Sequence, residues 1–278
     1  MNCAREESHL YPGFRFVGAL SSIGVQRDIQ GLILQALGPR RLFVVGCGYG
    51  EELATLLGEI VTRGLPVRVT AIDLLLVEER LNSHDFARRL GSRFKFFQLD
   101  LMDAPSMPGY GQFDVVQCGF VLHDITYPEK DRALKTLAES VRPSGYVVVS
   151  DIFCWKNNHN LAEVADIYDT FLYEAHFALG CGMLQRQQWQ SLLGDGSGPG
   201  LLSTKAEAAS GSRDYFETLD RMVDRAADCD LEICSIESNP VNPWLRVLVM
   251  RRKPATASRC PRGSGACFPI VTNCVGMS

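Results

Sequence analysis

Between residues 41 and 151 the sequence alternates short apolar runs with helix-like segments, and this alternation limits the possible fold more than any other feature. The runs are rich in Val, Ile and Phe, and they cover residues 41–46, 67–73, 94–100, 113–119 and 146–151. Strands that are buried on both faces of a parallel sheet have such nearly continuous apolar sequences. The sequence therefore predicts an α/β fold in which right-handed crossovers connect parallel strands.

Helices are expected between these runs, at residues 51–63, 78–90 and 128–141. The segment 128–141 interleaves charged residues, Lys130 among them, with Leu134, Leu137 and Val141, which is the pattern of an amphipathic surface helix. An earlier helix is expected at 23–37, because Gly38-Pro39 is a typical helix stop.

Two further apolar runs, 231–238 and 244–252, are separated by a short turn that contains Asn239-Pro240 and Pro243. Runs so close together form a hairpin, so the last strand is expected to be antiparallel to its neighbour. The expected fold class is α/β, a Rossmann-like doubly wound sheet of seven strands. The sheet is mostly parallel with a C-terminal antiparallel hairpin, and a helical lid accompanies it.

The chain is expected to divide into three parts. Residues 1–40 form an N-terminal helical cap, and residues 41–253 form the α/β domain. Within that domain, 152–230 is an insertion with helix-like patterns at 160–180 and 214–227, and it is expected to form the lid over the substrate. Residues 254–278 lack acidic residues and periodicity, so they are expected to be a disordered tail.

Composition excludes several classes of protein. Of the 278 residues, 46% are hydrophobic and 22% charged, which are globular values that exclude disorder of the whole chain. The net charge is −4 and no long basic run occurs, so no nucleic-acid partner is expected. No apolar run approaches the ~18 residues that span a membrane, and the first residues do not resemble a secretory signal. A cytoplasmic protein that binds a small molecule and no membrane is expected, with its oligomeric state open.

The cysteines do not predict a metal site. Three of the ten, Cys260, Cys267 and Cys274, lie in the C-terminal tail at intervals of seven residues. A zinc site would need cysteine pairs two to four residues apart together with histidine, and the sequence has no such pair. Reduced thiols in a cytoplasmic protein are expected instead.

A glycine-rich turn, Gly46 to Gly50, follows the first apolar run directly. Its G-x-G-x-G spacing lets the backbone approach a ligand closely, and the next helix begins there with unpaired N–H groups. The dinucleotide fingerprint would need a third glycine at Glu51, where a glutamate would also repel a pyrophosphate. The turn therefore favours a ligand without phosphates, and a tight turn without any ligand is the alternative.

Two aspartates end the next two apolar runs, Asp73 at the second and Asp100 at the third. Carboxylates at the carboxyl ends of strands in open α/β sheets face the ligand crevice. In such a crevice Asp73 can accept hydrogen bonds from both hydroxyls of a ribose, and Asp100 can accept one from an adenine amino group. A helix cap or a turn residue is the alternative for either aspartate.

Together these motifs resemble the class I S-adenosylmethionine-dependent methyltransferases over about residues 41–252. The resemblance rests on VVGCGYG, AID, FQLDLMD, FDVVQCGFVLHDI and RPSGYVVVSD, and on the terminal hairpin, which nicotinamide dehydrogenases lack. It implies S-adenosylmethionine as the cofactor and 41–253 as a methyltransferase domain. The sequence departs from the family at Val44, where an acidic residue is usual.

The resemblance also implies which residues hold the cofactor. Gly46, Gly48 and Gly50 would line its methionine portion, Asp73 would bind the ribose, and Asp100 with Leu101 would frame the adenine. Leu74 is also expected among the cofactor-binding residues. Cys118 would lie near the sulfonium, although a small apolar core residue is the alternative reading of this cysteine.

The segment that contains His123, LHDITYPEK, is similar to the LHDW segment of small-molecule O-methyltransferases, with Ile125 in place of the Trp. That resemblance implies that His123 is the general base, because histidine titrates near working pH. A histidine that caps the next helix is the alternative. The expected function is methyl transfer to a hydroxyl of a small, partly hydrophobic acceptor. The alternatives are an N- or C-methyltransferase without a histidine base, or a non-catalytic cofactor-binding or scaffold member.

Overall fold

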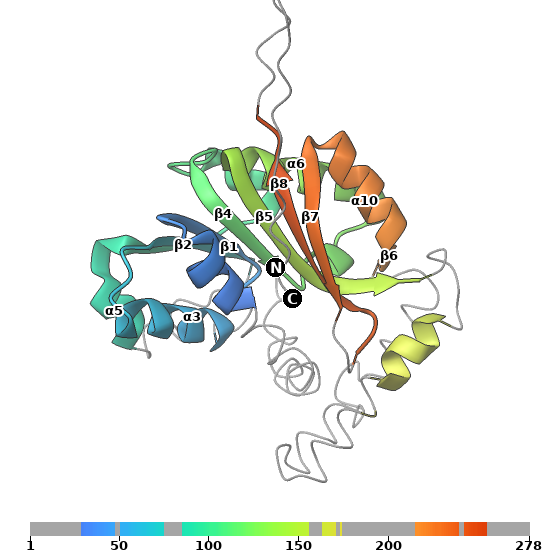
Figure 1. The fold of residues 1–278 in the computed structure, drawn as a ribbon, viewed down its shortest axis with the longest axis horizontal. Helices are drawn as coiled ribbons and strands as arrows, with labels where there is room; N and C mark the ends of the chain where they lie inside the picture. The colour runs from blue at the N-terminus through green and yellow to red at the C-terminus, as the bar shows by residue number, and fades with distance from the viewer. Residues whose placement is uncertain are drawn as a thin grey trace, which may run out of the picture.

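The computed structural model describes residues 29–47, 51–74, 85–155, 163–170, 173, 215–238 and 242–254. Within these ranges the chain forms one mixed sheet with helices on both faces (Figure 1). The strand order is β3-β2-β1-β4-β5-β8-β7, and β6 pairs with the end of β5. In the part of the chain that is described, no helix combines the length and the apolarity needed to cross a membrane.

Seven strands form the main path of the sheet. They are β1 (Arg41–Val45), β2 (Arg68–Asp73), β3 (Phe94–Gln98), β4 (Phe113–Gly119), β5 (Val141–Cys154), β7 (Leu231–Ser238) and β8 (Leu245–Arg252). Strands β1 to β5 pair in parallel, and β8 is antiparallel to both β5 and β7. The short β6 (Glu217–Thr218) pairs in parallel with β5. The predicted fold class is confirmed, and β8 lies inside the sheet rather than at its edge.

The helices follow the predicted alternation. They are η2 (Leu32–Leu37), α3 (Glu51–Thr62), α5 (Asp85–Leu90), η3 (Gly91–Arg93), η4 (Leu101–Ser106), η5 (Leu122–Asp124), η6 (Tyr127–Glu129), α6 (Lys130–Ser140) and α10 (Leu219–Asp228), and residues 163–170 are also helical. The predicted stop at Gly38 is confirmed, because Gly38 is left-handed (φ 52°) and its N–H bonds to Ile33 O at 3.0 Å.

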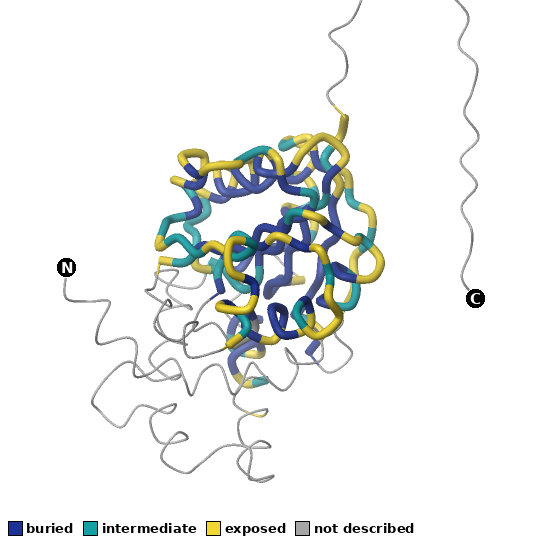
Figure 2. Tube along the Cα trace, turned by 90° about the vertical axis from the view of Figure 1, so that its left-hand side faces the viewer, coloured by how far each residue is buried: buried dark blue, intermediate teal, exposed yellow. Residues whose placement is uncertain are grey.

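Two hydrophobic clusters, one on each face of the sheet, explain why the strands are almost entirely apolar. Leu42 and Val44 of β1 pack in one cluster with residues of α3, whereas Phe43 and Val45 pack in the other with residues of α6. Alternate residues of a strand point to opposite faces, so a strand covered on both sides needs apolar residues throughout. Figure 2 shows this buried layer between more exposed helices.

Strand β5 is longer than predicted, since it begins at Val141 rather than near residue 146. The extra residues include Arg142-Pro143-Ser144-Gly145, a sequence typical of a turn. They join the ladder through an irregularity, because Val141 pairs with Phe113 while Tyr146 pairs with Val115. A register shift of this kind admits turn-forming residues into a strand.

Helix α10 lies in the range assigned to the lid, yet it packs on the sheet. Its residues Met222 and Ala226 are buried in the same cluster as α6, and the helix lies beside β7. Helix 163–170 lies beyond the carboxyl end of β5 (Figure 1). Most of the predicted cap, residues 156–162 and most of 171–214 of the predicted lid, and the predicted tail from residue 255 lie outside the described residues.

Candidate active site

The candidate site residues that the structure describes lie at one edge of the sheet, because the carboxyl ends of β1 to β5 meet there. In the ladder, Val45 is level with Ile72 of β2 and with Cys118 of β4, and Cys118 is level with Val149 of β5. The residues that follow these positions, Gly46 and Asp73 among them, therefore share this edge with the start of η5. In open α/β sheets ligands bind at this edge.

Gly46 makes the turn out of β1. It has a left-handed φ of 72°, and its N–H bonds to Ile72 O at 3.1 Å. A Cβ at this position would lie 2.0 Å from Cγ2 of Val121. A small cavity opens beside it, lined by Val44, Val45, Gly46, Cys47, Leu53, Leu56, Gln117 and Gly119. The other two predicted loop glycines, Gly48 and Gly50, lie outside the described residues.

Replacement of Gly46 by alanine is expected to destabilise the fold. The left-handed backbone strains any Cβ, and the overlap with Val121 adds a packing cost. Gly64→Ala is a matched control, since Gly64 also has a positive φ (63°) but no atom within 4 Å of the added Cβ. In urea denaturation, Gly46→Ala should lose about 1–3 kcal/mol more than Gly64→Ala. Equal losses would contradict the close packing at Gly46.

The two predicted strand-end carboxylates differ in their surroundings. Asp73 is half-buried at the end of β2, and the next residue, Leu74, exposes 65% of its surface. Asp100 caps η4, because its Oδ1 accepts a hydrogen bond from Met102 N at 2.8 Å. Leu101 is buried in the core beneath this edge. Asp100 therefore performs the capping role that was its alternative interpretation.

Cys118 and its neighbour Gln117 point to opposite faces of β4. Cys118 is fully buried in the core on the α6 side, and burial raises the pKa of its thiol, which therefore stays protonated. Gln117 faces the cavity instead and is level with Val44 of β1. Sequence reasoning missed Gln117, although a glutamine inside an otherwise apolar strand is a usable signal.

The chain turns sharply from β4 into the segment that carries His123. Phe120 has a left-handed φ of 55°, which a bulky residue rarely adopts, and its N–H bonds to Ser150 O at 2.8 Å. Such strained positions gather at functional sites. Two residues later η5 begins, so His123 stands directly above the end of β4.

His123 forms a buried pair with Asp151 of β5. Its Nδ1 lies 2.7 Å from Asp151 Oδ1, and only 12% and 2% of the two side chains are exposed. Asp151 also accepts hydrogen bonds from the backbone N–H groups of Leu122 (2.8 Å), His123 (3.3 Å) and Ile152 (2.8 Å). Four donors fill the capacity of a carboxylate. Sequence reasoning missed this role of Asp151; its signal was an acidic residue at the end of a strand of valines.

These contacts define the ionisation of the pair. Burial by itself would raise the pKa of Asp151, but His123 and the backbone donors outweigh it and hold the pKa below its usual value. An ionised Asp151 accepts a hydrogen bond from Nδ1–H, so neutral His123 carries its basic lone pair on Nε2. Asp124 Oδ1 lies 3.7 Å from Nε2. The pair can therefore take up a proton at Nε2.

Lys130 is a buried cation close to this pair. The sequence pattern placed Lys130 among the polar residues of a surface helix, but only 1% of it is exposed, which corrects that expectation. Its Nζ donates to Leu122 O, and it lies near two carboxylates, Asp151 and Glu217. Buried cations require such partners, and they explain why a lysine is tolerated here.

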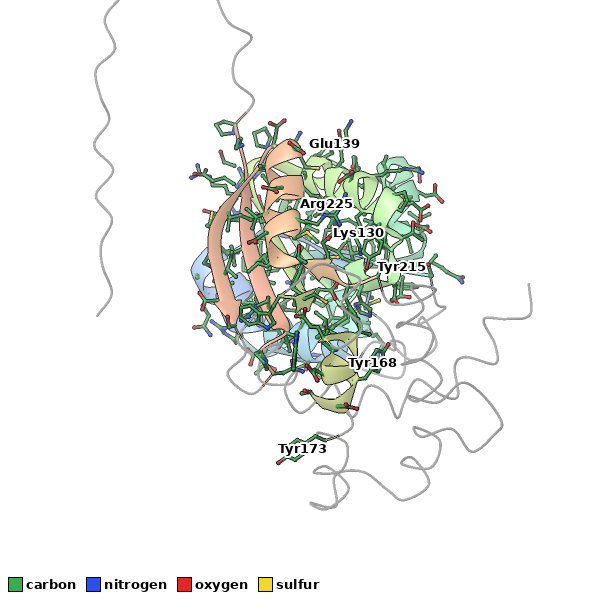
Figure 3. The ribbon with its side chains drawn as sticks, turned by 90° about the vertical axis from the view of Figure 1, so that its right-hand side faces the viewer. Lys130, Glu139, Tyr168, Tyr173, Tyr215 and Arg225 are labelled. Carbon is green, nitrogen blue, oxygen red and sulfur yellow. The ribbon has the colours of Figure 1, made fainter. Side chains whose placement is uncertain are left out.

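Glu217 extends the network to α10. Its Oε2 accepts a hydrogen bond from Arg225 Nε at 3.0 Å, and Arg225 also pairs with Asp131 of α6. Figure 3 labels Arg225 and Lys130 where α10 and α6 meet. The charges beneath His123 thus come from two helices and two strands.

Lys130 predicts an unusual dependence of stability on pH. Burial lowers its pKa to about 8 in the folded protein, against about 10.4 when unfolded. Between these values the unfolded chain binds more protons, so the free energy of unfolding should rise with pH. Relative to Lys130→Met, wild-type stability should gain up to about 3 kcal/mol between pH 7 and pH 10.5 in urea denaturation.

The exposed lysine of the same helix supplies the control for this measurement. Lys135→Met should show no such pH-dependent difference, because 69% of the Lys135 side chain is exposed. If the free energies of unfolding of wild type and Lys130→Met change with pH in parallel, the result would contradict the lowered pKa of Lys130.

Residues 215–218 pass next to His123. Tyr215 N donates to His123 O at 2.6 Å, and the ring of Phe216 lies 6.1 Å from the His123 ring. Tyr168, on helix 163–170, lies 6.3 Å from Phe216. Both residues are buried, so Phe216, with Tyr168 behind it, forms an apolar side of the site next to the histidine.

Comparison with known proteins supports the reading of this edge. Residues 43–147 match the family described as a methyltransferase domain. An O-methyltransferase family protein from Burkholderia thailandensis superposes with a TM-score of 0.56 at 17% identity, covering 90% of this chain and 63% of that one. The chain thus spans less than two thirds of that protein.

Two further solved structures are similar. The 1,6-didemethyltoxoflavin-N1-methyltransferase of Burkholderia thailandensis, with 1,6-didemethyltoxoflavin and S-adenosylhomocysteine bound, has a TM-score of 0.52 at 16% identity, covering 91% and 92% of the two chains. The magnesium protoporphyrin IX methyltransferase of Synechocystis, with S-adenosylhomocysteine bound, has a TM-score of 0.53 at 16% identity, covering 84% of each.

The structural similarity defines the fold first, since all three of these methyltransferases superpose on this chain with TM-scores above 0.5. The family match then specifies it. Residues 43–147 match the model of a methyltransferase domain, and the chain has the fold of these methyltransferases, as the sequence motifs predicted.

Proposed function

We propose that the protein transfers the methyl group of S-adenosylmethionine to a hydroxyl group of a small, partly hydrophobic acceptor. The observation that carries the proposal is the pair of His123 and Asp151, which is buried and lies beside the glycine turn at Gly46. A hydroxyl must lose its proton as its oxygen attacks the methyl carbon, and a base held in one tautomer suits this step.

His123 takes up that proton at Nε2. The oxygen–methyl bond forms as the methyl–sulfur bond breaks, and the proton of the hydroxyl passes to the imidazole. Asp151 holds the ring through Nδ1 and stabilises the positive charge that develops on it. Phe216 and Tyr168 keep the site apolar, which favours a partly hydrophobic acceptor over a strongly hydrated one.

The cofactor supplies the electrophilic methyl group when it is bound. Gly46, together with Gly48 and Gly50, would line its methionine portion. Asp73 would accept hydrogen bonds from the ribose hydroxyls, with Leu74 beside it at the same site. Asp100 contacts the adenine with its second oxygen, while Leu101 and Cys118 support this edge from the core.

Gln117 offers a polar group where this chain lacks the acidic residue that is usual in the family. The usual acidic residue is replaced by Val44, and the amide of Gln117 lines the same cavity level with Val44. We assign this amide to the polar end of the methionine portion. S-adenosylhomocysteine in two of the similar structures supports the choice of cofactor.

Two measurements on the full chain test the proposed function. Calorimetry should detect binding of S-adenosylmethionine or S-adenosylhomocysteine in the micromolar range, and failure of both to bind would contradict the proposal. Release of S-adenosylhomocysteine is then followed with a panel of small phenols and alcohols. Cofactor binding without turnover across the panel would favour the non-catalytic alternative, and turnover only with amine acceptors would favour an N-methyltransferase.

Substitution of Asp73 tests the assignment of the cofactor site. Asp73→Asn keeps the shape of the side chain but removes the charged acceptor for the ribose, so the Kd for S-adenosylhomocysteine should rise about 10–100-fold. Glu59→Gln, on the exposed side of α3, is the control and should leave the Kd unchanged. An unchanged Kd for Asp73→Asn would remove Asp73 from the cofactor site.

A further inference from the structure

Arg246 is a buried cation that the network around His123 does not include. It lies near the start of β8, with only 5% of its surface exposed. Among the described residues, no oxygen accepts a hydrogen bond from its guanidinium and no carboxylate forms an ion pair with it. Its recorded contact is the ring of Trp155, whose centroid lies 4.2 Å from the guanidinium carbon.

The sheet brings Arg246 next to the proposed base. Arg246 pairs with Asp151 in the antiparallel ladder of β8 and β5, and paired residues project on the same face. The alternating neighbours Val149 of β5 and Leu248 of β8 both belong to the cluster on the α6 side, which fixes that face. Asp151 is therefore bonded to His123 and paired in the ladder with Arg246.

Asp151 does not neutralise Arg246, although the two residues are paired across the ladder. Its two oxygens already accept four hydrogen bonds, from His123 Nδ1 and from three backbone N–H groups. Burial lowers the pKa of the Arg246 guanidinium below its usual value, and no described carboxylate offsets this effect. A buried guanidinium with five N–H donors and no acceptor is unfavourable unless an anion completes it.

We propose that Arg246 binds a carboxylate group of the methyl acceptor, beside the His123–Asp151 pair. The inference rests on the proposed function, because it names the class of acceptor for that same site. A planar guanidinium that is stacked on a ring presents its edge for a two-point hydrogen bond, and a planar carboxylate matches that edge. Trp155, 62% exposed, gives access from solvent and offers its ring to the apolar part of the acceptor.

Calorimetry of the full chain without cofactor tests this proposal directly. The probes are 4-hydroxybenzoate, 4-hydroxyphenylacetate and 4-hydroxycinnamate, each compared with its methyl ester, and phenyl phosphate. At least one acid should bind wild type about tenfold or more tightly than its ester, as expected for a charge-assisted hydrogen bond. Arg246→Gln should abolish this preference and leave the binding of the ester unchanged. Arg251→Gln, exposed on the same strand, should retain the preference.

Several results would overturn the proposal. These are equal binding of all acids and esters to wild type, a preference that persists in Arg246→Gln, and tighter binding of phenyl phosphate than of every carboxylate. Arg246→Met should also leave the midpoint of urea unfolding unchanged or raise it, since it removes an unpaired buried charge. A large fall in this midpoint would show that the guanidinium stabilises the fold, and it would contradict a role in ligand binding.

Binding of S-adenosylhomocysteine, measured in parallel, separates the two proposals. Bound S-adenosylhomocysteine without any preference for acids contradicts only the role of Arg246. An Arg246-dependent preference for acids without cofactor binding contradicts only the proposed function.

Discussion

Replacement of His123 by alanine is expected to lower kcat by a factor of about 10²–10⁴, the usual contribution of a general base. The Kd for S-adenosylhomocysteine should change little, because His123 belongs to the acceptor side of the site. Steady-state kinetics with the best acceptor of the panel, together with calorimetry of the cofactor, measure both quantities.

The control for His123→Ala is a substitution next to the proposed base that leaves the base itself in place. Asp124→Asn removes the charge 3.7 Å from Nε2 but retains His123 and Asp151, so kcat should fall much less than in His123→Ala. A loss in His123→Ala of less than about threefold would leave His123 only a positioning role and would favour the alternative without a histidine base.

Asp151→Asn is expected to reduce both activity and stability. The amide group of asparagine must face backbone N–H donors that now meet a carboxylate oxygen, and Lys130 loses one of the charges that compensate it. Removal of one partner from such a buried network costs about 3–5 kcal/mol of unfolding free energy. The activity of molecules that remain folded should fall about as far as in His123→Ala, because His123 loses its fixed tautomer.

A double variant separates the two effects of Asp151. If the two residues act as one unit, His123→Ala combined with Asp151→Asn should be no slower than the slower of the single variants. Multiplication of the two single losses would show instead that they act independently. Urea denaturation of each variant keeps the loss of fold apart from the loss of catalysis.

Most of the sheet could be predicted from sequence, because strands buried on both faces must be apolar throughout. Val44 and Val45 face different helices, and this need for apolar residues on both sides produces the continuous runs. The start of β5 could not be predicted, since Pro143 and Gly145 form a turn in most contexts. They belong to a strand here because β4 accommodates an irregular pairing at Phe113.

The rule that ligands bind at the carboxyl ends of parallel strands predicted Gly46 and Asp73 as candidate site residues, and the resemblance to the LHDW segment predicted His123. Neither predicted the partners of His123. Asp151 and Lys130 resemble ordinary strand-end and surface residues in the sequence. They gain their roles from pairing between β4 and β5 and from the docking of α10, both of which depend on residues far apart in the chain.

The position of β8 has a consequence for folding during synthesis. The ribosome makes the chain from its N-terminus, and a domain generally folds as a unit. Strand β7 is made before β8, yet β8 lies between β5 and β7. On the nascent chain, β7 therefore has no strand to pair with until β8 has emerged and inserted. Since β8 also carries Arg246, one late docking event closes the sheet and brings the guanidinium to the site, so ribosome-bound intermediates should expose the edge of β5.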